Sequence, residues 1–237
     1  MENIQFTKYK TRGAYHWNQI SHNLIERNSF VLARYINIIS LIKNNYGDIS
    51  NKKILDVGCG DGVLSYFLYK ENAFVSGIDS SELSINFAKL KTKNCNINFY
   101  HGSSNDLPFI NEEFDIVVSS DVIEHVFDYN KFLSEIHRVV KKQGLVVIST
   151  PIRITEAPLD KMHFIEWFQN EYKELITKHF PKSIFFESHP LFWSEFYLRS
   201  TLFRLILNVI SIFKNPFQGF TSKFRIKTMQ YSISTKK

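Results

Sequence analysis

Cysteine is scarce in this sequence. The 237 residues contain only Cys59 and Cys95, and their spacing matches no metal-binding motif. Cys59 lies inside a glycine-rich segment, where we expect an unbridged thiol. Free thiols are typical of a reducing compartment, so the composition favours the cytoplasm.

Long apolar runs are also absent. No stretch approaches the roughly 20 apolar residues that span a bilayer, and the first residues, Met-Glu-Asn-Ile-Gln-Phe, lack the apolar core of a secretion signal. No internal repeat is visible. With 44% hydrophobic residues, the chain is expected to form one globular domain with an additional segment.

The net charge of +6 is unevenly distributed. Residues 191–237 hold eight basic residues and one acidic residue, whereas residues 1–190 hold 21 basic and 22 acidic residues. The excess in the C-terminal region indicates either an anionic partner there or a solvated basic surface.

Three glycines follow a short apolar stretch. Residues 54–57 read Ile-Leu-Asp-Val, which predicts a buried parallel strand, and Gly58, Gly60 and Gly62 come directly after it. A helical apolar pattern begins at Val63. Glycine lets the backbone approach a ligand closely, and a helix N-terminus presents free N–H groups, so this arrangement predicts a nucleotide-type site. The dinucleotide fingerprint does not fit, because its third glycine would fall one residue later.

An acidic residue marks the end of the next strand. Residues 73–78 predict a second strand, and Asp79 follows it, about 20 residues after the first glycine. A carboxylate there can accept hydrogen bonds from both hydroxyls of a ribose. The alternative is that Asp79 or Ser80 only caps a helix that begins at Ser81.

The pattern Asp56-x-Gly58-x-Gly60-x-Gly62, with Asp79 after it, resembles motif I of the class I S-adenosylmethionine (SAM) dependent methyltransferases. The resemblance implies an α/β fold: a Rossmann-like, seven-stranded, mostly parallel sheet with helices on both faces. Its last strand is then antiparallel and lies between the fifth and sixth strands, and SAM binds across the strand ends. The cofactor-binding residues that it implies are Asp56, Gly58, Cys59, Gly60, Gly62, Asp79, Ser80, Ser103, Ser104, Ser120 and Tyr15.

One segment departs from the family pattern. Residues 101–109 read His-Gly-Ser-Ser-Asn-Asp-Leu-Pro-Phe, which resembles the segment in which an acidic residue commonly meets the adenine. Ser103 stands where that acid usually stands. The Ser103 hydroxyl, or a nearby backbone group, could take over the bond to the adenine amine.

The string Val-Ile-Glu-His-Val at 122–126 follows a predicted fourth strand at 114–118. It resembles the branch that contains quinone-biosynthesis and small-molecule O-methyltransferases, and this places Glu124 and His125 near the transferable methyl. A histidine with a near-neutral pKa can take the proton of an attacking hydroxyl. Alternatively, His125 packs beneath the loop and Glu124 holds it.

A second histidine follows the predicted fifth strand. His163 opens a segment that resembles the His-x-x-x-Trp/Phe segment of many relatives, and it is a candidate base or substrate-binding residue. Its alternative role is structural, at the start of the following helix. Methyl transfer from a sulfonium needs alignment and exclusion of water, and no metal-binding cluster is apparent in the sequence, so no metal is expected.

The remaining elements follow from periodicity. Lys141 and Lys142, followed by Gly144, predict the C-terminal end of the helix that is expected from residue 129. Tyr15, His16 and Trp17 are expected either to form a lid over the cofactor or to anchor the N-terminal helix. Helices are expected at 23–43, 81–91, 129–140 and before 179, and strands at 97–100, 145–149, 182–186 and 227–234.

The chain is expected to divide into four parts: an N-terminal helical lid segment (1–50), the SAM-binding core (51–189), a helical insertion (190–222) and the last strand (223–237). The insertion carries a narrow polar stripe and a wide apolar face with many aromatic residues. That face fits a membrane interface, a homodimer interface, a lid over an apolar substrate, or packing on its own domain. The stripe consists of Thr201, Arg204, Asn208, Ser211 and Asn215.

The nucleophile is expected to be an oxygen. The Asn/Asp-Pro-Pro-Tyr string that often marks nitrogen methylation in this superfamily is absent after the fourth strand, and so is the pyrimidine-carbon pattern. These absences disfavour a nucleic-acid substrate. The expected activity is O-methylation of a small-molecule hydroxyl, on a sugar of a surface glycan or its precursor or on a prenylated lipid, by a cytoplasmic enzyme with a peripheral contact at the inner membrane face.

Three alternatives remain open. The basic C-terminal region would suit an RNA methyltransferase or RNA-binding protein, with salt-sensitive binding. The cofactor residues would suit a membrane-associated SAM-binding protein without catalysis. A nicotinamide dehydrogenase is the third, and binding of NADH in place of SAM would support it.

Overall fold

The computed structural model describes residues 8–158, 160–220 and 223–237. The first residues of the chain, on which the secretion-signal expectation depends, and residues 221–222 of the expected insertion lie outside this part. The strands are β1 (Lys53–Val57), β2 (Phe74–Asp79), β3 (Ile97–His101), β4 (Phe114–Ser120), β5 (Val140–Pro151), β6 (Ser183–Pro190) and β7 (Lys227–Thr235). The α-helices are α1 (Lys8–Arg12), α2 (Tyr15–Gln19), α3 (Ser29–Tyr46), α4 (Val63–Lys70), α5 (Glu82–Lys91), α6 (Tyr129–Val139), α7 (Gln169–His179), α8 (Leu191–Arg199) and α9 (Thr201–Phe213), and η1 (Ile123–His125) is a single 3₁₀ turn.

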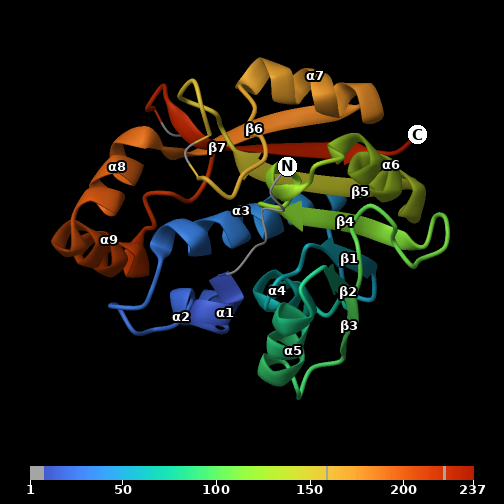
Figure 1. Ribbon diagram of the computed structural model, residues 1–237, viewed down its shortest axis with the longest axis horizontal. Coiled ribbons are helices and arrows are strands. Elements are labelled where there is room, and N and C mark those ends of the chain that lie inside the picture. Colours follow the sequence, from blue (N-terminus) through green and yellow to red (C-terminus); the bar gives the residue numbers. More distant parts are fainter. Residues whose placement is uncertain (1–7, 159, 221–222) are drawn as a thin grey trace.

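The seven strands form one sheet in the order β3-β2-β1-β4-β5-β7-β6 (Figure 1). β7 pairs antiparallel with both β5 and β6, and the other pairs are parallel. The order reverses between β1 and β4, which is the point where open α/β sheets bind ligands. The structure confirms the expected fold class and the expected place of the last strand.

Two apolar cores lie on the two faces of the sheet. One joins α3 and α4 to inward side chains of the central strands and β7. The other joins α6 and α7 to the opposite side chains of the same strands. Alternate residues of the strands serve opposite cores, since Ile54 belongs to the first and Leu55 to the second. This double burial explains the nearly continuous apolar sequence of the central strands.

The expected helix stop at Gly144 is wrong. α6 ends at Val139, and Val140 already has extended backbone angles. β5 then runs through Gly144, beside a register shift in its pairing with β4. A Cβ on Gly144 would lie 2.8 Å from the carbonyl oxygen of Lys141 and 2.9 Å from that of Asp115. Glycine is needed here because the backbone passes close to its neighbours, and not because a helix ends.

The long N-terminal helix begins later than its apolar pattern suggested. α3 starts at Ser29, and the side chain of Asn28 accepts a hydrogen bond from the backbone N–H of Val31. This cap fixes the start of the helix six residues after the expected Asn23. The helix expected from Ser81 is present with Ser81 as its N-cap, which accepts from the N–H of Ser84.

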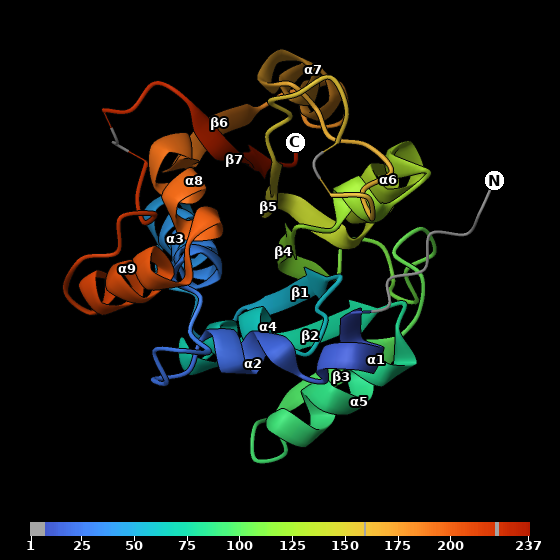
Figure 2. The same cartoon turned by 60° about the vertical axis from the view of Figure 1, so that its left-hand side comes forward.

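The insertion folds as α8 and α9, which pack beside α3 (Figure 2). The second part of its polar stripe faces inward, because Asn208, Ser211 and Asn215 are buried, whereas Thr201 and Arg204 are exposed. Its apolar side is exposed, which rules out packing on its own domain among the four alternatives. The exposed apolar residues of α8 and α9 include Phe192, Phe196, Leu198, Leu202, Phe203, Leu205, Ile206, Val209, Ile210, Ile212 and Phe213. Of the helices in the described residues, none has the length and apolar content that crossing a bilayer requires.

Candidate functional site

The glycine turn after β1 is built for close backbone contact. Gly58 and Gly60 have φ angles of +74° and +55°, which side chains disfavour. A Cβ on Gly58 would lie 2.3 Å from Cγ2 of Val122, and one on Gly60 would lie 2.2 Å from the hydroxyl of Tyr9. The two glycines therefore keep the turn narrow where it meets the cleft.

Gly62 has a different task. It is the N-cap of α4 with a φ angle of +85°, and a Cβ there would lie 3.0 Å from both Ala88 and Phe99. It lets α4 begin tightly against α5 and β3. Gly62 is not among the described residues that line the cleft.

Asp79 ties the end of β2 to the glycine turn. Its Oδ2 accepts a 2.9 Å hydrogen bond from the N–H of Gly60, and its Oδ1 accepts from the N–H of Ser81 at 2.8 Å and from the hydroxyl of Ser84 at 3.0 Å. Burial raises its pKa above the ordinary value. The capping role and a ligand role are compatible, because each carboxylate oxygen can accept more than one hydrogen bond.

Asp56 lies deeper, beneath the glycine turn. It is buried, and its Oδ2 accepts a 2.6 Å hydrogen bond from the hydroxyl of Ser65. Burial raises the pKa of Asp56 to about 7. The residue supports the glycine turn from below and also reaches the cleft.

A cleft of about 420 Å³ opens at these strand ends. Most residues expected from the sequence line it: Tyr15, Asp56, Gly58, Cys59, Gly60, Asp79, Ser80, Ser104, Ser120, Glu124, His125 and His163. Ser103 is not among its described lining residues; its Oγ accepts from the N–H of Asn105 at 3.1 Å, on an exposed turn. Ser104 and Gly102 line the cleft instead.

The N-terminal helices are anchored on the glycine turn and also line the cleft. The indole N–H of Trp17 donates a 2.7 Å hydrogen bond to the carbonyl of Asp61, and the carboxylate of Asp61 accepts from the backbone N–H of His16 at 3.0 Å. Tyr9, Tyr15 and His16 line the cleft. Trp17 thus anchors the segment on the glycine turn, and Tyr15 lines the cleft.

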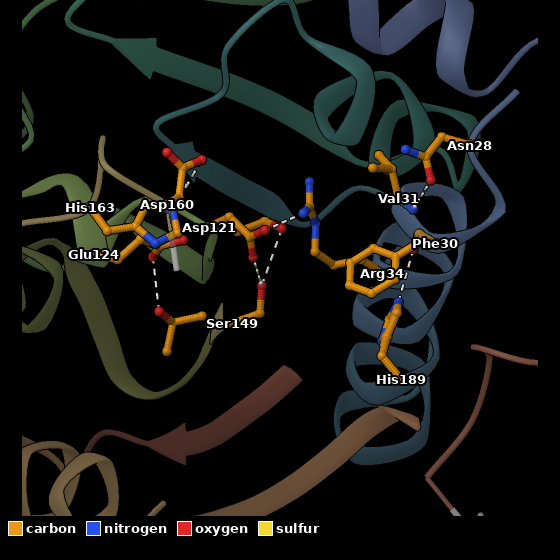
Figure 3. Close-up of polar contacts among 12 residues, drawn as sticks. Asn28, Phe30, Val31, Arg34, Asp121, Glu124, Ser149, Asp160, His163 and His189 are labelled. Carbon is orange, nitrogen blue, oxygen red and sulfur yellow. Dashed lines mark hydrogen bonds and ion pairs between the residues drawn. The ribbon is translucent and has the colours of Figure 1, made fainter. Parts of the chain in front are cut away.

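The opposite end of the cleft is formed by η1 and the loop after β5. Glu124 is fully buried, and its Oε2 accepts a 2.9 Å hydrogen bond from the hydroxyl of Thr150. Nδ1 of His125 lies 2.8 Å from the carbonyl oxygen of Met162. The two histidine rings, of His125 and His163, are 4.7 Å apart between centroids in an edge-to-face arrangement. Figure 3 shows Glu124 and His163 lying close together.

Burial sets the protonation of this end. Burial raises the pKa of Glu124 well above its ordinary value, and the nearby charge of Asp121 raises it further. Burial lowers the pKa of His125, which keeps its imidazole neutral at physiological pH. A neutral imidazole can accept a proton or bind a cation.

The sequence reasoning missed one ion pair at the centre of the cleft. The guanidinium of Arg34, on α3, contacts the carboxylate of Asp121, directly after β4 (Figure 3). Both residues line the cleft, and Asp121 has a φ angle of +53°. A signal was available in the sequence, because Arg34 is the only charged residue between Ser29 and Ile42, a stretch that is mostly apolar.

These features fit SAM. The glycine turn lacks side chains at Gly58 and Gly60, so its backbone can come close to a ligand. Asp79 lies beside this turn, at the end of β2. Asp56, Gly58, Gly60 and Asp79 would hold the nucleoside end, and Ser120, Glu124 and His125 also line the cleft.

Residues 48–189 match the family model described as a methyltransferase domain. The chain belongs to this methyltransferase family. The match confirms the class I SAM-dependent methyltransferase recognised in the glycine motif, and with it SAM as the cofactor of the family.

Named relatives of this methyltransferase include ubiquinone biosynthesis O-methyltransferases. The protein of Pelagibacter ubique is 35% identical over 122 residues, covering 49% of this chain and 51% of that protein. The protein of Rickettsia prowazekii is 33% identical over 153 residues, covering 60% of each. The chain thus spans about half the length of the curated relatives it matches.

Solved structures share the fold at low identity. Phosphoethanolamine N-methyltransferase 2 of Haemonchus contortus, in complex with SAM, superposes with a TM-score of 0.67 at 16% identity, over all of this chain and 60% of that one. The MccD protein superposes with a TM-score of 0.61 at 19% identity, over 85% of this chain and 96% of that one.

Proposed function

We propose that this methyltransferase transfers the methyl group of SAM to a hydroxyl of an acceptor that is held at a membrane surface. The acceptor is a prenylated lipid or a lipid-linked sugar. SAM supplies an electrophilic methyl on a sulfonium, so the protein has to align an oxygen with it and keep water out. The names of the relatives, ubiquinone biosynthesis O-methyltransferase, support oxygen as the nucleophile.

Each end of the cleft has a separate task in this proposal. The glycine turn and Asp79 hold the cofactor, and Tyr15 on α2 covers it. At the other end, Glu124, His125 and His163 receive the acceptor hydroxyl and assist the loss of its proton. A neutral His125 suits that task, because a protonated imidazole could not help to remove a proton.

The observation that carries the membrane part is the outward apolar face of α8 and α9. Leu198 and Phe213 are 82% and 88% exposed, and the apolar residues between them continue the same surface. Such a contiguous apolar face on a protein surface marks a docking site. Each buried aliphatic or aromatic side chain would contribute about 1.5–3 kcal/mol, so a few of them suffice for stable association.

Charge identifies an anionic membrane as the occupant. The exposed cations around the apolar face are Arg199, Arg204, Lys214, Lys223 and Arg225, and Glu195 is the one acid of residues 191–237. Each Lys or Arg near an anionic bilayer contributes about 1 kcal/mol to the free energy of membrane binding. A second copy of the chain would bring the same positive charge to the interface, which disfavours a homodimer through this face.

The face also lies beside the cleft. α9 packs on Ser29, at the first turn of α3, and the next turns of α3 carry Val31 and Arg34, which line the cleft. A lipid-anchored acceptor could therefore reach the cleft while its lipid part stays in the bilayer.

The first test is calorimetric titration with S-adenosylhomocysteine beside NADH. Micromolar binding of the former alone supports a methyltransferase; NADH binding in its place would overturn it. An acceptor screen with polyprenyl lipids and nucleotide sugars follows. Methylation of a lipid acceptor, faster on anionic vesicles than in solution, supports the full proposal, whereas salt-sensitive RNA binding and methylation of RNA would replace it.

A further inference from the structure

We infer that Glu124, His125 and His163 form a binding site for a divalent first-row transition-metal ion at the acceptor end of the cleft. The inference deepens the proposed function and rests on it for the metal's role in catalysis, though not for its binding. One ligand atom from each of the three residues lies within 4.8 Å of the others. All three residues line the cleft.

The buried carboxylate gives the first argument. Glu124 is fully buried, and while its Oε2 accepts from Thr150, its Oε1 has no hydrogen-bond partner among the described residues. A buried oxygen without a partner is costly, so such an atom needs an explanation. Asp121 and Asp160, by contrast, form ion pairs with Arg34 and Lys8, and Oδ2 of Asp160 also lies 4.0 Å from Nε2 of His163. A cation at the cluster would satisfy Oε1 of Glu124.

The histidine tautomers give the second argument. Nδ1 of His125 faces the carbonyl oxygen of Met162 at 2.8 Å, and a carbonyl can only accept, so Nδ1 carries the hydrogen and Nε2 the lone pair. Nδ1 of His163 lies 2.6 Å from Oε1 of Glu166, which is buried. A histidine that donates one N–H to a carbonyl or carboxylate while the other nitrogen binds the metal is the usual arrangement in metal sites.

The positions of the three residues are fixed by the backbone. The N–H of Phe164 donates a 2.8 Å hydrogen bond to the carbonyl of Glu124, which ties the loop after β5 to η1. Ligands of a tetrahedral ion at about 2.0–2.2 Å lie roughly 3.4 Å from one another. Small side-chain rotations, closing the cluster by about 1 Å, would therefore complete the site.

The donor set identifies the ion. Two imidazoles and one carboxylate suit zinc, cobalt, manganese or iron, whereas magnesium and calcium prefer oxygen ligands. Three protein ligands leave at least one position open toward the cleft, as in catalytic sites.

The open position explains how the acceptor would be activated. With the Nε2 lone pair of His125 on the metal, the imidazole could not accept the proton. The metal would take over this task by lowering the pKa of the acceptor hydroxyl, whose proton would leave to solvent. The oxygen lone pair then forms the O–CH₃ bond, and the electron pair of the S–CH₃ bond stays on sulfur. The products are the methyl ether, S-adenosylhomocysteine and one proton, so atoms and charge balance.

The test uses the full chain, stripped of metal with a chelator and titrated with Co²⁺, Zn²⁺ and Mg²⁺. Co²⁺ is expected to bind at one equivalent with visible d–d absorption, and Zn²⁺ to displace it, while Mg²⁺ at the same concentration leaves the spectrum unchanged. His163→Asn and Glu124→Gln should each abolish the band. Glu166→Gln, which touches the ligand and not the metal, should weaken Co²⁺ binding about 10- to 100-fold. His22→Gln, an exposed histidine, is the matched control and should bind Co²⁺ normally.

S-adenosylhomocysteine binding separates this inference from the proposed function. Each variant should bind it like the parent chain, which shows an intact fold and cofactor site. Saturating Co²⁺ titration without a d–d band in the parent chain, or full methyl transfer after chelation, would overturn the metal site while leaving the methyltransferase proposal in place. Metal binding without S-adenosylhomocysteine binding would support the metal site but contradict the proposed function.

Discussion

The hydroxyl of Ser29, in the first turn of α3, donates a 2.8 Å hydrogen bond to Oδ1 of Asn208 on α9. Both residues are fully buried. The amide of Asn208 also donates to the carbonyls of Leu24 and Arg27 at 2.9 and 2.7 Å. These bonds fix the polar side of α9 against the domain, and the apolar side must therefore face outward.

Replacing Asn208 by Leu should destabilise the chain. The change keeps the branched shape of the side chain but leaves the hydrogen-bonding groups of Ser29 and two carbonyls unsatisfied, each worth about 1–3 kcal/mol. We expect a loss of about 3 kcal/mol or more in the free energy of unfolding, measured by urea denaturation. The neighbouring, exposed Val209 provides the control, because Val209→Leu should change the free energy of unfolding by less than about 0.5 kcal/mol. Equal stability of the two variants would mean that α9 is not held by its polar side.

Membrane binding should depend on the outward face of α9. The double variant Ile206→Ser with Phe213→Ser removes two exposed apolar side chains, which together would contribute about 3 kcal/mol to insertion. Binding to anionic vesicles, measured by flotation, should fall roughly 100-fold. Leu90→Ser, at an apolar residue of α5 whose exposure lies between those of Ile206 and Phe213, should bind like the parent chain. Equal loss in both variants, or no vesicle binding by the parent chain, contradicts the proposed surface.

Much of the fold was predictable because its signals are local. The Asp-x-Gly-x-Gly-x-Gly motif, a strand after it and an acid at its end define the first half of a Rossmann-like sheet. The place of β7 came from resemblance, since pairing between strands far apart in sequence leaves no mark in either strand. Gly144 misled because a glycine after basic residues has the same sequence signature whether it ends a helix or lets two backbones approach closely.

The site was predictable only in part, for a similar reason. The positions of Asp79 and the glycines follow from the local sequence of the turns that contain them. These residues line the cleft or support it. The pairing of Arg34 with Asp121, and the meeting of His163 with Glu124, join segments that tertiary packing alone brings together. The orientation of α9 escaped prediction because amphipathicity shows that two faces differ, but not which face is buried.

The stability of the chain should fall as the pH rises through the range in which Asp56 titrates. Its pKa is about 7 in the folded chain, whereas an exposed aspartate has a pKa of about 3.9. Between these two values the folded state holds a proton that the unfolded state has released. Stability from this group is therefore complete below pH 4 and is lost as the pH approaches and passes 7. In Asp56→Asn this dependence should disappear, and the difference between parent and variant should change by roughly 2–4 kcal/mol between pH 4 and 8. Urea denaturation across that range measures it, and parallel curves would show that Asp56 is ionised in the folded chain.

Gly58→Ala should weaken cofactor binding through Val122. The added Cβ would lie 2.3 Å from Cγ2 of Val122, a stiff β-branched side chain, in a backbone conformation with φ of +74°. Strain in that conformation costs roughly 1–2 kcal/mol, and relief of the clash would displace Val122, which precedes η1 and Glu124. We expect at least a tenfold loss in S-adenosylhomocysteine affinity by calorimetry.

The double variant Gly58→Ala with Val122→Ala separates the two causes. Removing the valine methyls restores the space but not the backbone freedom, so part of the affinity should return while about a tenfold deficit remains. Val122→Ala alone should bind within a few-fold of the parent chain. Full recovery in the double variant would assign the whole effect to the contact with Val122, and unchanged affinity in Gly58→Ala would mean that the cofactor does not depend on the narrow turn.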